Sequence, residues 1–198
     1  MSALEGKSVV LTGAAQGLGA AIARHFHGLG AGLILLDRDG EGLAETCAAC
    51  PGATSAVVDL SDVGDTERAI AAVVTGPIDT LIHNAAILRV EPLGAVSLGT
   101  FQETLNVGIQ AAFQLTKAVW PDMKERGGSL VFVTSRSGIE GFADETAYCA
   151  AKHALEGFSK CLAMEGAPHG ILSVTITPGM YMHTPMSETT YPPELREK

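Results

Sequence analysis

The sequence predicts a single α/β domain built on a doubly wound parallel sheet, with helices on both faces of the sheet. Three observations lead to this fold class. Six short apolar runs alternate with longer stretches of helical spacing. The runs are continuously apolar, as is typical of strands buried on both faces. The chain of 198 residues with 46% hydrophobic content can bury a core without the help of a metal or a disulfide.

Each element follows from its local composition. Strands are expected where Val, Ile and Leu dominate a run that turn residues bound, at residues 8–12, 32–36, 55–58, 80–83, 130–134 and 172–176. Helices are expected in the stretches between these runs, at residues 17–29, 41–49, 62–74, 100–125 and 146–168. After residue 176 the chain becomes polar and proline-containing, and its last five residues, ELREK, resemble the first turn of a helix.

Charge and hydropathy exclude several classes of protein. The chain has 13 Lys and Arg against 22 Asp and Glu, a net charge of −9, and contains no basic run, so we do not expect a nucleic acid partner. No apolar stretch is long enough to span a membrane. The N-terminus carries an acidic residue, Glu5, and does not read as a signal peptide, so we expect a cytoplasmic location.

Two of the four cysteines, Cys47 and Cys50, form a C-x-x-C pair. The pair could be a redox site or half of a zinc site. However, no second C-x-x-C or H-x-x-H follows, and the pair ends an expected helix rather than following a strand. Reduced structural thiols are therefore the preferred interpretation, and no metal is expected.

A glycine-rich turn, with glycines at positions 13, 17 and 19, follows the first expected strand and opens the first expected helix. Such a turn lets the backbone approach a pyrophosphate at the positive end of a helix, although glycines can also simply shape a β–α turn. Asp37 ends the second strand, where a carboxylate would accept hydrogen bonds from the ribose of NAD and repel the 2′-phosphate of NADP. Arg38 could cover a 2′-phosphate, and Asp37 could be an ordinary turn residue. We expect NAD, with NADP as the alternative.

Tyr148 and Lys152 are four residues apart in an expected helix and share one face. A cation beside a phenol lowers the pKa of the phenol, which would make Tyr148 a general base, although the two residues could also be ordinary surface positions. Ser135 ends the fifth strand, and Asn84 follows the fourth. Asn106 is a polar residue in an otherwise apolar helical stretch, and could be a tolerated surface position.

Taken together, these residues resemble the short-chain dehydrogenase/reductase family. The resemblance covers about residues 6–184, and the motifs that carry it are the glycine turn, Asp37, Asp59-Leu60, His83-Asn84-Ala85-Ala86, Asn106, Ser135, Tyr148, Lys152 and Pro178-Gly179. It implies a Rossmann fold that binds NAD or NADP at the carboxyl ends of the strands.

The resemblance also implies roles for individual residues. Tyr148 would be the general acid/base, Lys152 its partner, Ser135 the hydroxyl that orients the substrate oxygen, and Asn106 the site of a helix kink that holds a water. Thr184 would bind the nicotinamide carboxamide. The implied catalytic residues are Asn106, Ser135, Tyr148 and Lys152, and the implied cofactor-binding residues are Gly13, Gln16, Gly17, Leu18, Gly19, Asp37, Asp59, Leu60, Asn84, Ala85, Tyr148, Lys152, Pro178, Gly179 and Thr184.

The sequence departs from the family pattern at several points. His83 stands where the family usually has Asn, Ala86 where it has Gly, and Ser137 is a second serine near the active one, although spacing to Tyr148 favours Ser135. The usual seventh strand and last helix are absent. Residues 172–176 should therefore form an edge strand, and we expect the sequence to be part of a longer chain.

The expected function is that of an NAD-dependent oxidoreductase, which transfers hydride between the cofactor and a secondary alcohol or ketone. The alternative is a nucleotide-binding protein of the same fold without turnover. A methyltransferase would reuse the glycine turn and Asp37 but would leave Ser135, Tyr148 and Lys152 unexplained.

The resemblance further implies a homodimer or homotetramer formed through the helices from Thr100 to Glu125 and from Thr146 to Pro168. Phe142 and residues 180–182 suggest a partly apolar pocket, which does not identify the substrate.

Overall fold

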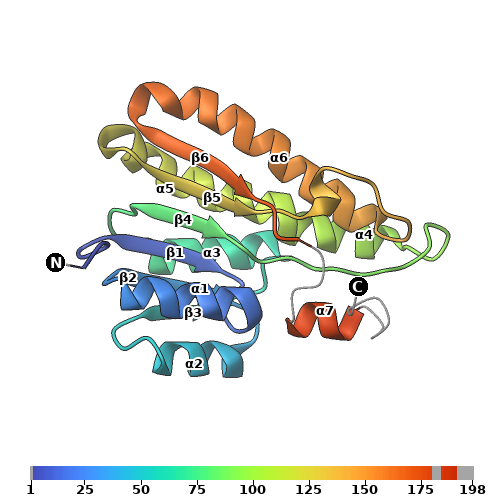
Figure 1. Cartoon of the computed structure of the whole chain (residues 1–198), viewed down its shortest axis with the longest axis horizontal. Coiled ribbons are helices and arrows are strands. Elements are labelled where there is room, and N and C mark those ends of the chain that lie inside the picture. The colour runs from blue at the N-terminus through green and yellow to red at the C-terminus, as the bar shows by residue number, and fades with distance from the viewer. Residues whose placement is uncertain (1, 180–183, 191–198) are drawn as a thin grey trace.

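The computed structural model describes residues 2–179 and 184–190 and contains one six-stranded parallel sheet (Figure 1). The strand order is β3-β2-β1-β4-β5-β6, and every neighbouring pair is parallel. The strands are β1 (Ser8–Thr12), β2 (Gly32–Asp37), β3 (Thr54–Val57), β4 (Thr80–His83), β5 (Gly128–Val133) and β6 (Ile171–Ile176). The predicted fold class is confirmed, and each strand lies within two residues of its predicted bounds at either end.

The helices cover both faces of this sheet, as predicted. They are α1 (Gly17–Gly28), α2 (Gly40–Ala48), α3 (Val63–Val73), α4 (Leu98–Leu105), α5 (Ala111–Arg126), α6 (Thr146–Gly166) and α7 (Pro185–Thr190). The single helix predicted over residues 100–125 is instead interrupted by a π-helical segment at Asn106–Gln110. The short helix α7 was not predicted, and the ELREK segment lies outside the described residues.

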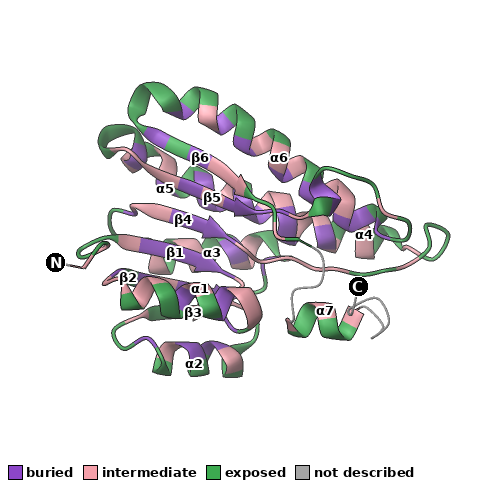
Figure 2. Cartoon of the chain, in the orientation of Figure 1, coloured by how far each residue is buried: buried purple, intermediate pink, exposed green. Residues whose placement is uncertain are grey.

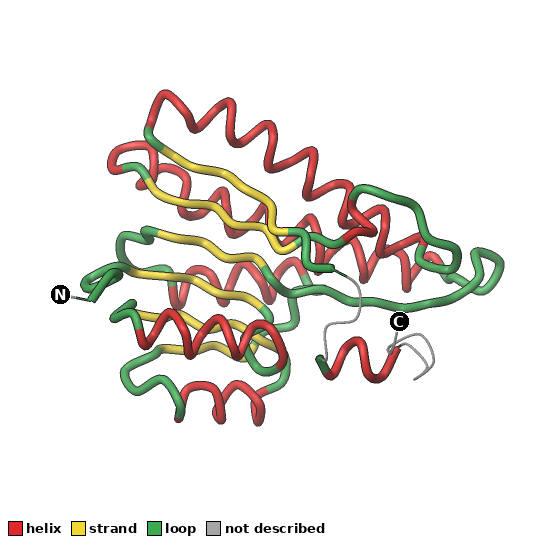
Figure 3. The backbone as a smooth tube through the Cα atoms, in the orientation of Figure 1, coloured by secondary structure: helices red, strands yellow, loops and turns green. Residues whose placement is uncertain are grey.

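The core is divided into two parts by the sheet, because successive side chains of a strand point to opposite faces. Val9 and Leu11 of β1 pack with α1 and α2, whereas Val10 packs with α5 and α6 on the other face. Figure 2 shows this burial running along the sheet and the facing sides of the helices. The parallel arrangement brings all the strand carboxyl ends to one edge of the sheet, as the arrowheads of Figure 1 show. Figure 3 shows the loops that join the ends of the strands to the helices, and those at the carboxyl edge can build a site.

Strand β6 lies at one edge of the described sheet, as the sequence predicted. Its Leu172 and Ile176 side chains are 56% and 51% exposed. Among the described residues, no helix has the length and apolar character needed to cross a membrane.

Candidate functional site

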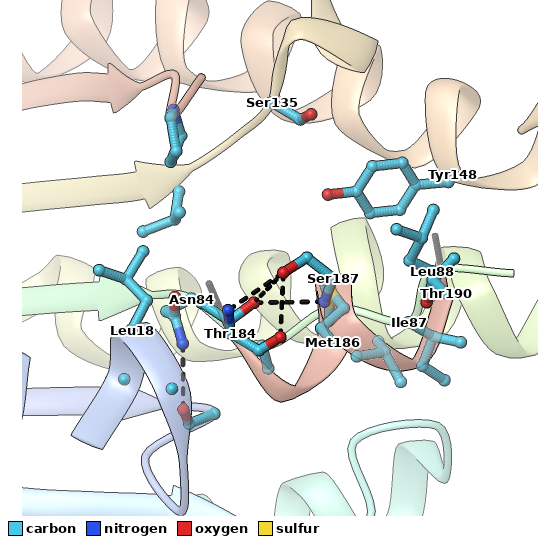
Figure 4. A pocket seen from close by; sticks show the side chains of 18 of the residues that line it. Leu18, Asn84, Ile87, Leu88, Ser135, Tyr148, Thr184, Met186, Ser187 and Thr190 are labelled. Atoms are coloured by element: carbon cyan, nitrogen blue, oxygen red, sulfur yellow. Dashed lines mark hydrogen bonds between the residues drawn. The ribbon is translucent and has the colours of Figure 1, made fainter. Parts of the chain in front are cut away.

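A cavity of about 510 Å³ lies at the carboxyl edge of the sheet (Figure 4). It is lined by the loops that follow all six strands, by the beginnings of α1 and α6 and by α7. All the predicted site residues line it except Asn106: Gly13, Gln16, Gly17, Leu18, Gly19, Asp37, Asp59, Leu60, Asn84, Ala85, Ser135, Tyr148, Lys152, Pro178, Gly179 and Thr184. Phe142 also lines the cavity, while residues 180–182 lie outside the described residues.

The glycine turn forms a concave backbone surface, called here the cradle, whose space any side chain at its glycine positions would fill. Gly13 has a φ of +67°, in the left-handed region that favours glycine. A Cβ atom at Gly19 would lie 1.8 Å from the Gly13 carbonyl oxygen, so only glycine fits there. Among the described residues, the Gln16 side chain makes no capping hydrogen bond at the start of α1. The turn therefore leaves the positive end of this helix facing the cavity, an arrangement that fits a pyrophosphate.

Asp37 is held rigidly at the end of β2. Its Oδ2 atom accepts a hydrogen bond from the Ala15 backbone N–H at 2.9 Å, and its Oδ1 atom accepts one from the Asp39 N–H at 3.0 Å. The carboxylate thus stabilises the turn and also lines the cavity. The interpretation of Asp37 as a turn residue is therefore compatible with its interpretation as a ribose-binding residue. The pKa of the neighbouring Asp59 carboxyl is lowered, chiefly by hydrogen bonds from Ser61.

Asn84 connects the end of β4 to the glycine turn. Its Nδ2 atom donates to the Gly13 carbonyl oxygen at 3.0 Å and to the Thr12 carbonyl oxygen at 3.3 Å. The Thr12 hydroxyl oxygen accepts hydrogen bonds from the backbone N–H groups of Asn84 and Ala85 at 3.0 and 3.1 Å. These contacts fix the loop beside the glycine turn and close one side of the cradle.

His83, one of the departures from the family pattern, is fully buried beneath this loop. Its Nε2 atom lies 2.8 Å from the Gly108 carbonyl oxygen and 3.1 Å from that of Val107, so Nε2 must carry the proton. Its Nδ1 atom then accepts the hydrogen bond from the Thr12 hydroxyl, at 3.0 Å. Burial, and to a smaller extent the nearby Lys152 ammonium, lowers the pKa of His83 to about 4. The imidazole therefore joins β1, β4 and the π-helical segment as a neutral group.

Tyr148 and Lys152 both lie on α6, and Figure 4 shows the Tyr148 hydroxyl directed into the cavity on the side of Ser135. The Lys152 Nζ atom lies 5.5 Å from the centre of the Tyr148 ring and donates to the Val133 carbonyl oxygen at 2.6 Å. Burial raises the pKa of Tyr148 to about 12, opposed by a hydrogen bond from Ser135 and reinforced by the Glu145 carboxylate. Burial also lowers the pKa of Lys152 to about 8.

This electrostatic result differs from the sequence-based expectation that the lysine would lower the pKa of the phenol. Helical spacing correctly places the two side chains on one face of α6. However, loss of solvation is the largest effect on the phenol, and the ammonium is bound to a backbone carbonyl. Tyr148 is therefore protonated at neutral pH and suited to donating a proton.

Asn106 begins the π-helical segment, and its Nδ2 atom donates to the Ser61 carbonyl oxygen at 2.8 Å. Its side chain therefore anchors the segment to the loop after β3 and does not line the cavity. The segment passes close to α6, since a Cβ atom at Gly108 would lie 2.8 Å from the Ala151 Cβ atom. The helix interruption expected at Asn106 is present, as is common for π-helical segments near functional sites.

Sequence reasoning missed several residues that line the cavity. Glu145 is buried and accepts a hydrogen bond from the Ser137 hydroxyl at 2.7 Å. Its position at the start of α6, three residues before Tyr148, could have indicated it. The remaining unforeseen residues include Ile87, Leu88, Met186, Ser187 and Thr190. Several of them lie on α7, a helix that no sequence pattern indicated.

The C-x-x-C pair lies at the end of α2, and neither cysteine lines the cavity. Both cysteines are free; Cys50 is buried, and burial raises the pKa of its thiol. A raised pKa disfavours the thiolate that redox and metal chemistry require.

Comparison with known proteins gives consistent results. The family model for short chain dehydrogenases matches residues 7–194. L-xylulose reductase from Mus musculus is 33% identical over 190 residues, which cover 95% of this chain and 77% of that protein. Carbonyl reductase [NADPH] 2 from Sus scrofa is 32% identical, with 98% and 79% covered. The crystal structure of 3-ketoacyl-(acyl-carrier-protein) reductase from Brucella melitensis complexed with NADH is 27% identical, covers 98% of this chain and 83% of its own, and has a TM-score of 0.90.

Proposed function

Because the chain belongs to the short-chain dehydrogenase family of oxidoreductases, we propose that it transfers hydride between NAD and a ketone or secondary alcohol, with Tyr148 as general acid/base. The observation that carries this proposal is that Tyr148, Ser135 and Lys152 line the same cavity as the glycine turn and Asp37. One cavity can thus hold a dinucleotide and a small carbonyl compound side by side.

The bound nicotinamide would supply the hydride, and the protein would orient the reactants and move the proton. The Tyr148 hydroxyl, with its pKa raised to about 12, would donate a proton to the carbonyl oxygen during reduction. Ser135 would orient the same oxygen. The Lys152 ammonium, anchored on the Val133 carbonyl, would hold positive charge near the phenolate that forms.

We further propose that NAD is preferred to NADP. The support is the Asp37 carboxylate, which the Ala15 and Asp39 N–H groups hold at the end of β2, where it would repel a 2′-phosphate. Arg38 also lines the cavity and favours the opposite choice. Both cofactors occur among the known relatives, since one relative is named for NADPH and one solved structure is described as complexed with NADH.

The cofactor proposal is tested by calorimetric titration of the purified chain with NADH and NADPH. Micromolar binding of NADH with much weaker binding of NADPH would support it, and the reverse order would refute it. Turnover should then be measured with L-xylulose, ketoacyl thioesters and simple ketones. Cofactor binding without turnover of any of these would favour the alternative of a nucleotide-binding protein.

We also propose that the chain forms homodimers or homotetramers through the helices at residues 100–125 and 146–168. The support is that these helices expose large apolar side chains, with Phe113 50% and Met164 80% exposed. Sedimentation velocity at several concentrations tests this, and a monomer at all of them would refute it.

A further inference from the structure

A second polar pair lies next to the proposed catalytic residues. The Ser137 hydroxyl donates to the Glu145 Oε2 atom at 2.7 Å, and both residues are only 5% exposed. Both line the cavity that Ser135 and Tyr148 line. Glu145 is the residue that precedes α6, three positions before Tyr148, and its carboxylate is close enough to help raise the pKa of the Tyr148 phenol.

The Glu145–Ser137 pair accepts hydrogen bonds from its surroundings rather than donating them. A carboxylate accepts hydrogen bonds at about four positions and donates none. The only hydroxyl hydrogen of Ser137 is used on Glu145, and the Ser137 oxygen accepts a hydrogen bond from the Ser135 hydroxyl at 3.4 Å. The Glu145–Ser137 pair thus offers acceptors, whereas the Tyr148 hydroxyl, protonated at neutral pH, offers a donor.

A ligand that fits both groups has an acceptor and a donor close together. The carbonyl oxygen of a ketone accepts from Tyr148, and a hydroxyl elsewhere on the same molecule donates to the pair. A plain ketone would cover the buried carboxylate with apolar surface, which is unfavourable for a charged group.

We propose that Glu145, held by Ser137, accepts a hydrogen bond from a substrate hydroxyl, so that the site selects hydroxyketones over the corresponding unsubstituted ketones. This assignment rests on the proposed function, because it requires that a ketone is reduced beside Tyr148. It makes Glu145 a specificity-determining residue and defines the substrate class as hydroxylated carbonyl compounds.

The test compares kcat/KM for reduction of 3-hydroxy-2-butanone and of 2-butanone, which differ by one hydroxyl. Because the hydroxyl also changes the reactivity of the carbonyl, the informative quantity is the change of this ratio between a variant and the unaltered protein. Glu145→Leu should lower the ratio by about 10–100-fold, the factor expected for a hydrogen bond to a charged acceptor. Glu145→Gln should lower it less, since an amide oxygen still accepts. The matched control is Glu140→Gln, which neutralises a nearby exposed carboxylate paired with Arg136 and should keep the ratio.

The possible outcomes separate the two proposals. If Glu145→Leu lowers kcat/KM equally for both ketones, or for neither, the assignment of Glu145 is wrong although the enzyme remains a reductase. If this variant does not fold, as judged by circular dichroism, Glu145→Gln and Ser137→Ala must each lower the ratio at least about threefold, and an unchanged ratio in either refutes the assignment. If the unaltered protein reduces no ketone with either cofactor, the proposed function itself fails, and this inference fails with it.

Discussion

Acid should destabilise this protein partly through His83. In the folded structure both ring nitrogens of His83 are in hydrogen bonds, so the imidazole cannot take up a second proton without losing one of them. Nε2 donates to the Gly108 and Val107 carbonyl oxygens, and Nδ1 accepts from the Thr12 hydroxyl, which in turn accepts from the Asn84 N–H. Protonation of Nδ1 would place two donors opposite each other. The perturbation we consider is therefore a change from pH 7 to pH 5, compared between the unaltered protein and His83→Asn.

The magnitude follows from the two pKa values. The pKa of His83 is about 4 in the folded protein against an ordinary 6.5. The folded state thus binds fewer protons than the unfolded state, and stability is lost as pH falls below 6.5, until the loss is complete below about 4. The full difference corresponds to about 3 kcal/mol, of which about 2 kcal/mol is lost by pH 5.

The assay is urea unfolding at pH 7, 6 and 5, with the free energy of unfolding extrapolated to water. Carboxylates titrate in both proteins and cancel in the comparison, so the unaltered protein should lose about 2 kcal/mol more than His83→Asn between pH 7 and pH 5. His153→Asn, which removes an exposed histidine, measures the background effect of losing any histidine. Equal losses in the unaltered protein and His83→Asn would refute the argument that His83 is held neutral.

Three further predictions concern the proposed cofactor-binding and catalytic residues. Tyr148→Phe should lower turnover by about 10²–10⁴-fold with NADH binding nearly unchanged in calorimetry, since only proton transfer is lost; more than about a tenth of normal turnover would contradict the role. Asp37→Ala should reduce the ratio of the NADPH to the NADH dissociation constant, and an unchanged ratio would exclude Asp37 from cofactor choice. Gly19→Ala should destabilise the fold by about 2 kcal/mol or more, because its methyl would lie 1.8 Å from the Gly13 carbonyl oxygen. In the control Gly157→Ala nothing lies within 4 Å of the new methyl, so urea unfolding should find it neutral or up to about 1 kcal/mol more stable.

The sheet and the position of the site could be predicted because each depends on local sequence alone. A run such as residues 8–12 is apolar on both faces and can only be satisfied inside a parallel sheet covered by helices. Once the strands are parallel, their carboxyl ends meet at one edge. Gly13, Asp37, Asn84 and Ser135, each at or just after the end of a strand, then line the same cavity.

The kink at Asn106 was implied by the family resemblance, but its π-helical form and the charge state of Tyr148 could not be predicted from local sequence, since both depend on contacts between distant parts of the chain. The segment is shaped by the approach of Gly108 to Ala151 and by the bond from Asn106 to the Ser61 carbonyl. The spacing of Tyr148 and Lys152 predicts that they are neighbours, but it says nothing of how deeply α6 buries them. Burial is the largest effect on the pKa of both.

The buried polar groups around the cavity are unfavourable for stability, and this in itself supports their role in the site. The pKa of Lys152 falls to about 8, so burying the ammonium destabilises the fold at neutral pH, and an apolar residue would remove this cost. His83 likewise makes the protein sensitive to acid, and Glu145 brings a carboxylate into the interior beside the phenol. Each group is held by a specific partner, namely the Val133 carbonyl for Lys152, the Thr12 hydroxyl for His83 and the Ser137 hydroxyl for Glu145. Three such groups lie at or directly beneath one cavity, and stability alone gives no reason to gather them there, whereas proton transfer and substrate recognition do.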